Sequence, residues 1–172
     1  LLSKRVDKGK MDASKMADVL NSITPTLNYG DFKNVDLVVE AVVENMEVKK
    51  KVFAEVEKEV SEDCLLTSNT SSLSVEEMAK ALKRSERFAG LHFFNPVNKM
   101  PLVEIIRHSG VSEETIQKLY KWTLDVKKTP VVVNDGPGFL VNRILAPFLN
   151  EAISPNFTTS QFSGIIPIFV SL

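Results

Sequence analysis

Apolar residues follow two different periods along this chain, and the change of period predicts strands and helices in turn. A near-continuous apolar run at 36–43 suits a buried strand, because both faces of such a run avoid water. Shorter apolar runs predict further strands at 65–68, 88–93, 102–106 and 129–133. Apolar residues at helical spacing predict helices over 12–23, 46–60, 74–82 and 113–126.

Polar residues mark where several of these helices begin. Asp12 suits an N-cap, and Ser74 followed three residues later by Glu77 is a capping box. Segment 139–150 is also predicted to be helical, with an interruption at Pro147. Strands that alternate with helices favour βαβ units and a mainly parallel sheet, so the fold class is α/β.

Composition narrows the class of protein. The 172 residues are 44% hydrophobic and 25% charged, which suits one globular domain, and a net charge of −1 gives no reason to expect nucleic acid. One cysteine, Cys64, excludes an internal disulfide framework, and two histidines are too few for a zinc site. No segment reaches the roughly 20 apolar residues of a membrane span. The prediction is an intracellular protein with a small-molecule partner, cytoplasmic if bacterial and mitochondrial or peroxisomal if eukaryotic.

Four polar segments follow predicted strands, at 44–45, 69–72, 92–95 and 134–138. Ligands of parallel sheets bind beyond the carboxyl ends of the strands, so the four segments are predicted to line one crevice. The alternative is that loops are polar only because they are solvated. Within this set, His92 ends one apolar run and Glu104 lies inside the next, and a histidine beside a carboxylate can exchange a proton near neutral pH.

Five ordered motifs carry a family resemblance. They are AVVEN at 41–45, SNTSS at 68–72, GLHFFNP at 90–96, PLVEI at 101–105 and DGPGFLVNR at 135–143. With these motifs, residues 1–152 resemble the L-3-hydroxyacyl-CoA dehydrogenases. They are most similar to the dehydrogenase part of the multifunctional alpha subunits of fatty-acid oxidation complexes.

The resemblance implies NAD-dependent oxidation of (S)-3-hydroxyacyl-CoA to 3-oxoacyl-CoA in fatty-acid β-oxidation. His92 matches the catalytic base and Glu104 its carboxylate partner, while Ser71 and Asn142 match positions that hydrogen-bond the substrate oxygen or the nicotinamide region. It also implies an oligomeric parent protein, with a thiolase subunit as a candidate partner. The positions implied to contact NAD are Val42, Val43, Glu44, Lys49, Ser71 and Asn95.

Structural alternatives stay open for Ser71 and for the Glu44–Lys49 pair, and a third polar residue, His108, has only a structural interpretation. Ser71 lies three residues before the helix-capping Ser74 and could only shape the loop. Glu44 and Lys49 could form a plain surface pair at the start of a helix. His108, which lies beside Gly110 and has no place in the motifs, is interpreted as a solvated loop residue.

The chain also departs from the family pattern. No Gly-x-Gly-x-x-Gly fingerprint occurs in it, so the pyrophosphate cradle is missing from these residues. Residues 1–6 read as the end of a helix already under way, and 152–172 contain no charged residue. We therefore expect a fragment with a partial, doubly wound Rossmann-like NAD-binding domain at 1–134, the first helix of a truncated all-α domain at 135–152, and a non-matching tail at 153–172.

Two alternatives to an active dehydrogenase stay open. Ser71, His92 and Glu104 contain the groups of a hydrolytic triad, which makes an acyl-CoA hydrolase conceivable. However, the chain has no Gly-x-Ser-x-Gly elbow, and the order of the three residues matches no common triad. The other reading is a catalytically incompetent fragment of the dehydrogenase, which binds a partner or nothing at all.

Overall fold

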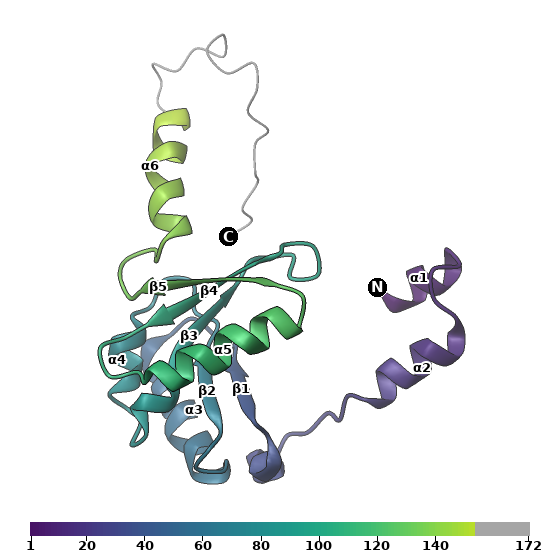
Figure 1. The fold of residues 1–172 in the computed structure, drawn as a ribbon, viewed down its shortest axis with the longest axis horizontal. Coiled ribbons are helices and arrows are strands. Elements are labelled where there is room, and N and C mark those ends of the chain that lie inside the picture. The colour runs from purple at the N-terminus through teal and green to yellow at the C-terminus, as the bar shows by residue number, and fades with distance from the viewer. Residues whose placement is uncertain (154–172) are drawn as a thin grey trace.

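Each predicted apolar run forms a strand, and the strands join in one sheet (Figure 1). The structure is a computed structural model that describes residues 1–153. The strands follow one another across the sheet in chain order. They are β1 (Leu37–Glu40), β2 (Leu65–Ser68), β3 (Phe88–Phe93), β4 (Leu102–Arg107) and β5 (Thr129–Asn134).

The predicted helices are also present, with small differences at their ends. They are α1 (Leu2–Asp7), α2 (Ala13–Asn21), α3 (Met46–Glu59), α4 (Val75–Ala79), α5 (Glu113–Asp125) and α6 (Val141–Ile153), and two 3₁₀ turns lie at η1 (Tyr29–Asn34) and η2 (Ser85–Arg87). Asp12 and Ser74 cap α2 and α4 as predicted, because their side chains accept the N–H groups of Lys15 and Glu77. Helix α4 is shorter than predicted. Helix α6 continues through Pro147 instead of breaking there.

Strand direction reverses once across the sheet. Strands β1, β2 and β3 are parallel, β4 is antiparallel to β3, and β5 is parallel to β4. The segment between β3 and β4 is too short for a crossover, so β4 returns beside β3. The sheet is therefore mainly parallel, as predicted, with one antiparallel pair.

This reversal puts helices on both faces of the sheet. Right-handed crossovers from β1 through β3 place α3 and α4 on one face, and the crossover between the reversed strands β4 and β5 places α5 on the other. One core cluster contains Phe53 of α3 and Met78 of α4, and a second contains Ile116 and Leu119 of α5. The arrangement confirms the Rossmann-like, two-sided α/β fold.

The strand predicted at 36–43 is present, but it is shorter and less buried than predicted. Strand β1 ends at Glu40, and the apolar run continues into an exposed turn, where Val42 is 39% and Val43 is 67% exposed. Among the described residues β1 pairs only with β2, so its outer side forms the edge of the sheet. An apolar run indicates a buried strand only when neighbours cover it, and β1 lacks one on this side.

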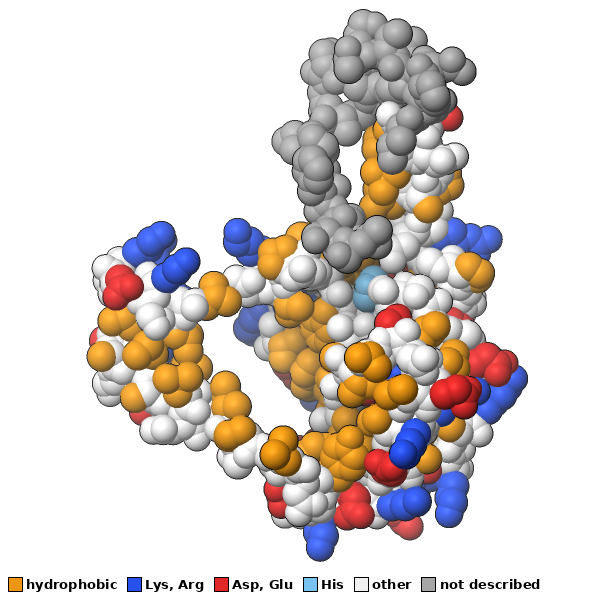
Figure 2. All heavy atoms as spheres, turned by 180° about the vertical axis from the view of Figure 1, so that it is seen from behind, with side chains coloured by type: hydrophobic (Ala, Val, Ile, Leu, Met, Phe, Trp, Pro, Cys, Tyr) orange, Lys and Arg blue, Asp and Glu red, His pale blue; other side chains and the backbone are white. Residues whose placement is uncertain are grey.

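Helices α1 and α2 stand apart from the sheet, joined to it by an extended segment (Figure 1). Neither helix has a buried residue. Figure 2 shows apolar side chains gathered on this part of the chain, where Leu20, Ile23 and Leu27 are exposed. Among residues 1–153, no helix has the length and apolar character that a membrane crossing requires.

Candidate active site

His92 and Glu104 face each other across β3 and β4. They are register partners in the antiparallel pair, and Nδ1 of His92 lies 2.8 Å from Oε2 of Glu104. His92 is 6% exposed and Glu104 is fully buried. A carboxylate can only accept, so Nδ1 carries the proton of the neutral ring and Nε2 keeps a free lone pair. The contact expected between these two residues is present, and it leaves one nitrogen ready to accept a proton.

The other oxygen of Glu104 holds the start of α6. Oε1 accepts the backbone N–H groups of Leu140 and Val141, at 3.0 and 2.9 Å. Burial by itself would raise the pKa of Glu104, but hydrogen bonds from His92 and from these N–H groups lower it below its ordinary value. The carboxylate thus stays charged and fixes the tautomer of His92.

The turn before α6 brings these N–H groups to Glu104. Gly138 and Phe139 both have positive φ, at 71° and 50°. A Cβ on Gly138 would lie 3.0 Å from the backbone nitrogen of Arg143, so the turn needs a glycine there for two reasons. The ring of Phe139 lies 5.7 Å from that of His92, and the ring of Phe94 lies 4.6 Å from it. These two rings form an apolar wall beside the imidazole.

The four polar segments do not all start at the same end of the sheet, although the prediction assumed that they do. The carboxyl ends of β1, β2 and β3 lie together at one end of the sheet, whereas β5 runs the opposite way and has its carboxyl end at the other end of the sheet. The segment after β5 reaches the site only by crossing back over the sheet. Asp135 anchors it on the way, because its Oδ2 accepts from Ser74 Oγ at 2.8 Å and Glu76 N at 2.9 Å.

Asn142 and Ser71 meet through the backbone of Ser71. Nδ2 of Asn142 donates to the Ser71 carbonyl oxygen at 3.4 Å, and the Ser71 side chain is exposed. The Ser71 N–H donates to Oε1 of Glu44 at 3.1 Å. The structure therefore links the polar segments after β1 and β2 to the first turn of α6.

Glu44 and Lys49 do not form a plain surface pair. The Lys49 side chain is 1% exposed, and its Nζ lies 3.2 Å from Oε2 of Glu44 and 2.8 Å from Oε1 of Glu40. Burial by itself would raise the pKa of Glu44, but hydrogen bonds from Thr70, Lys49 and the Ser71 N–H lower it. Lys49 thereby orders the carboxylate that holds the Ser71 loop.

The sequence analysis did not identify two polar residues that lie beside Lys49 and Glu44. Glu40 is buried at the end of β1, where its oxygens accept from Val42 N at 2.6 Å and Ser68 Oγ at 2.7 Å. A charged residue inside an apolar strand run is rare without a buried partner, and this signal could have identified Glu40. Ser68 belongs to the SNTSS motif, but its contact with Glu40 was not predicted.

The remaining residues predicted to contact the cofactor follow the carboxyl ends of β1 and β3. Val42, Val43 and Asn95 are exposed, the two valines directly beside Glu44. Exposed apolar side chains next to a carboxylate suit a flat ring and a hydroxyl-bearing sugar, so these residues fit the nicotinamide half of NAD. No residue of the chain supplies the glycine loop that would cradle the pyrophosphate.

His108 is not a solvated loop residue, as was predicted, but is 4% exposed. Its Nε2 lies 3.1 Å from the carbonyl oxygens of Ser85 and Phe88, and its Nδ1 accepts the Gly110 N–H at 3.1 Å. Both nitrogens are thus used by the backbone. The role of His108 is to join β4 to the turn before β3.

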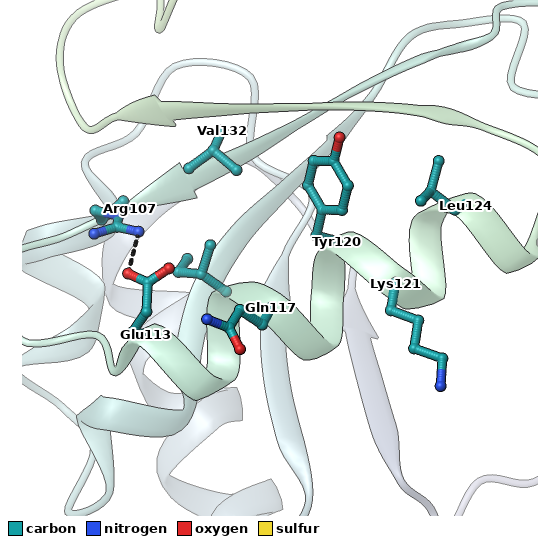
Figure 3. Close-up of a pocket in the computed structure, with 8 residues that line it drawn as sticks. Arg107, Glu113, Gln117, Tyr120, Lys121, Leu124 and Val132 are labelled. Carbon is teal, nitrogen blue, oxygen red and sulfur yellow. Dashed lines mark hydrogen bonds and ion pairs between the residues drawn. The ribbon is translucent and has the colours of Figure 1, made fainter.

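A groove of about 350 Å³ lies elsewhere, between α5 and the strands β4 and β5 (Figure 3). Tyr120, Leu124 and Val132 line it, with the Arg107–Glu113 ion pair at one end. None of the predicted site residues lines this groove. Among residues 1–153 no cluster of histidine, cysteine and carboxylate side chains is arranged to hold a metal ion.

A two-sided Rossmann-like sheet with a histidine–carboxylate pair beside its parallel strand ends defines the class of a dinucleotide-dependent dehydrogenase domain. Residues 1–136 match the family described as 3-hydroxyacyl-CoA dehydrogenase, NAD binding domain. The chain belongs to this family, and NAD is the cofactor of the domain.

Curated relatives support this family assignment. The chain is 58% identical over 148 residues to the fatty acid oxidation complex subunit alpha of Pseudomonas entomophila, covering 86% of the chain and 21% of that protein. It is 55% identical to the same subunit of Colwellia psychrerythraea, covering 86% and 20%. The chain thus spans about a fifth of the length of these curated relatives.

Solved structures show the same fold. The 3-hydroxybutyryl-CoA dehydrogenase of Escherichia coli K12 superimposes with a TM-score of 0.84 at 40% identity, covering 88% of this chain and 32% of that one. The (S)-3-hydroxybutyryl-CoA dehydrogenase PaaH1 of Ralstonia eutropha gives 0.84 at 39% identity, covering 88% and 53%. The resemblance read from the five motifs is confirmed.

Proposed function

We propose that the natural protein carrying this chain oxidises (S)-3-hydroxyacyl-CoA to 3-oxoacyl-CoA, with His92 as general base. The observation that supports this most directly is the 2.8 Å contact between Nδ1 of His92 and Oε2 of Glu104. It leaves Nε2 unprotonated at the edge where the parallel strands end. This nitrogen is the base that removes the hydroxyl proton of the substrate.

Glu104 stabilises the charge that this step creates. As Nε2 takes the proton, the ring becomes an imidazolium, and the ionised Glu104 carboxylate is already in contact with its Nδ1–H. NAD, when bound, supplies the acceptor for the hydride that leaves C3 of the substrate. Nearly complete burial of the pair strengthens the attraction between carboxylate and imidazolium.

Asn142 and Ser71 orient the reacting groups. In the proposed role, the exposed Ser71 hydroxyl hydrogen-bonds the substrate oxygen or the nicotinamide amide, as does the Asn142 amide. Neutral donors suit this place because they do not compete for the proton. The Asn142–Ser71 contact and the Ser71–Glu44 contact hold the two residues in one place.

NAD contacts are proposed for residues at the end of β1 and in the neighbouring loops. Val42 and Val43 provide an apolar surface, and Glu44, Ser71 and Asn95 provide polar groups. Lys49 contributes through its ion pair with Glu44. We also propose that a partial NAD-binding domain ends at residue 134 and that a helical domain begins at 135–152. Segment 154–172 of the predicted tail lies outside the described residues.

The assembly of the whole protein is part of the same proposal. Several relatives are named as subunits of a fatty acid oxidation complex. We propose that the protein with this chain also works in a complex, with a thiolase subunit as the partner to test, on an acyl-CoA substrate and at an intracellular location.

The test of the base is His92→Gln in the natural protein, with whatever sequence flanks these residues. The kcat for 3-hydroxyacyl-CoA oxidation should fall about 100- to 10,000-fold, and the Kd for NAD should stay within about twofold, because the ring acts on the substrate proton. His108→Gln is the matched control. His108 contacts backbone groups and the Glu76 carboxylate, none of which is a predicted site residue, so this variant should lose stability and keep its kcat. A kcat for His92→Gln close to that of the wild type would remove the histidine from this role.

Acyl-CoA hydrolysis is the less favoured function. A triad needs the Ser71 hydroxyl hydrogen-bonded to the histidine, and among the described residues His92 is bonded only to Glu104. Release of free CoA without NAD would reveal such an activity.

A further inference from the structure

A charge cluster lies at the end of β1, formed by Glu40, Lys49 and Glu44. The side chains of Glu40 and Lys49 are 2% and 1% exposed, whereas that of Glu44 is 40% exposed. Lys49 Nζ lies 2.8 Å from Glu40 and 3.2 Å from Glu44. One buried ammonium therefore joins an inner carboxylate to an outer one.

Every contact of Glu40 suits a carboxylate. Val42 N and Lys49 Nζ donate to its Oε1, and Ser68 Oγ donates to its Oε2. The charge cluster thus contains two carboxylates against one ammonium and keeps one net negative charge. Because the inner carboxylate, Glu40, is removed from water, its charge is screened less than that of a surface carboxylate.

The outer end of the charge cluster lies beside the residues proposed to handle the substrate. Glu44 accepts the Ser71 N–H at 3.1 Å, and the Ser71 carbonyl accepts from Asn142. Hydride transfer requires the nicotinamide ring next to the substrate carbon, so under the proposed function the ring lies at this end. The ring is positively charged when oxidised and neutral when reduced.

We propose that the charge cluster favours the oxidised dinucleotide over the reduced one, and that Glu40 is a positioning residue that sets this preference from beneath the site. This inference rests on the proposed function. A net negative charge attracts the cationic ring and has no such attraction for the neutral ring. The difference promotes release of the reduced cofactor after each turnover.

Glu40→Gln tests the proposal without altering a surface that the cofactor touches. The amide has the shape of the carboxylate and leaves Lys49 paired with Glu44, so the net charge of the cluster becomes zero. The Kd for NAD+ should rise about tenfold, and the Kd for NADH should stay within about twofold. NADH binding is followed by its own fluorescence, and NAD+ binding by displacement of NADH, both in the natural protein.

Ser68→Ala is the matched control, because it removes one hydrogen bond to Glu40 and keeps the charge. It should change both Kd values by the same factor. If Glu40→Gln fails to fold, Glu44→Gln supplies the same test, since it leaves the buried Glu40–Lys49 pair intact and should lower the preference for NAD+ as well.

Equal losses of NAD+ and NADH affinity in Glu40→Gln and Glu44→Gln would overturn the proposal and assign the cluster a structural role only. If the wild-type protein binds neither dinucleotide, the proposed function itself fails. The two failures are therefore distinguishable.

Discussion

A buried carboxylate is stable only when donors surround it, and Glu104 has three. His92 contacts one oxygen, and the N–H groups of Leu140 and Val141 contact the other. The same side chain therefore fixes the proposed base and the start of α6. At the residue scale, the chemistry of the site and the attachment of the next helix depend on one charge.

Glu104→Gln should reduce the free energy of unfolding by about 1.5 to 3 kcal/mol at neutral pH, because a charge-assisted contact is lost. The folded-state pKa of Glu104 lies below its ordinary value of 4.5. Its stabilising effect is thus complete above pH 4.5 and is lost as the pH falls through the folded-state pKa. Urea unfolding at several pH values should show a shallower decline below this point in the variant.

Glu55→Gln, at an exposed position of α3, is the matched control. It should follow the wild type at every pH. Parallel pH profiles for Glu104→Gln and the wild type would contradict the assignment of this linkage to Glu104.

At the scale of elements, the sheet and α4 approach each other closely at Gly90. A Cβ there would lie 2.7 Å from Cβ of Ile106 and 2.9 Å from Cγ2 of Val75. Gly90 lies on β3, two residues before His92, so this close approach sets the distance between α4 and the strand that carries the proposed base. The glycine is required here by space and not by its backbone angle.

Gly90→Ala should lower the free energy of unfolding by about 1 to 3 kcal/mol, because the added methyl group has no room among rigid neighbours. Gly136→Ala is the control, since the nearest atom to a Cβ there is 4.0 Å away. Chemical denaturation of both variants measures this loss. Equal free energies of unfolding for Gly90→Ala and Gly136→Ala would show that α4 can move away from the sheet without loss of stability.

At the scale of the whole molecule, the proposed function assigns one half of a dinucleotide site to the described residues. The groups proposed to contact the nicotinamide half lie at the ends of β1, β2 and β3, but the chain contains no glycine fingerprint for the pyrophosphate. In such folds the backbone N–H groups of that loop and the helix after it contribute much of the anion binding.

The 172-residue chain by itself should therefore bind NAD with a Kd well above the micromolar range. Trp122 reports on this edge, because its ring packs edge-on against Phe93 at the end of β3. In a fluorescence titration, NAD and nicotinamide mononucleotide should bind with similar weak affinity. Micromolar binding of NAD alone would mean that these residues hold the pyrophosphate as well.

Residue order was enough to predict the elements and the family. The spacing of apolar residues located every strand, because the side chains that a strand buries recur at a fixed spacing along the chain. The motif pattern paired His92 with Glu104, and these side chains do meet. Both results depend on residues that are close in sequence or fixed by a known motif.

Only the tertiary structure decided which groups are buried and from which end of the sheet each loop reaches the candidate active site. The apolar run at 36–43 was expected inside but lies at the edge of the sheet, and His108 was expected in water but is enclosed. The reversal at β4 sends the segment after β5 back over the sheet, and buried partners turn Glu40 and Lys49 into one cluster with Glu44. Burial and charge pairing arise between segments distant in sequence, so the order of residues alone could not determine them.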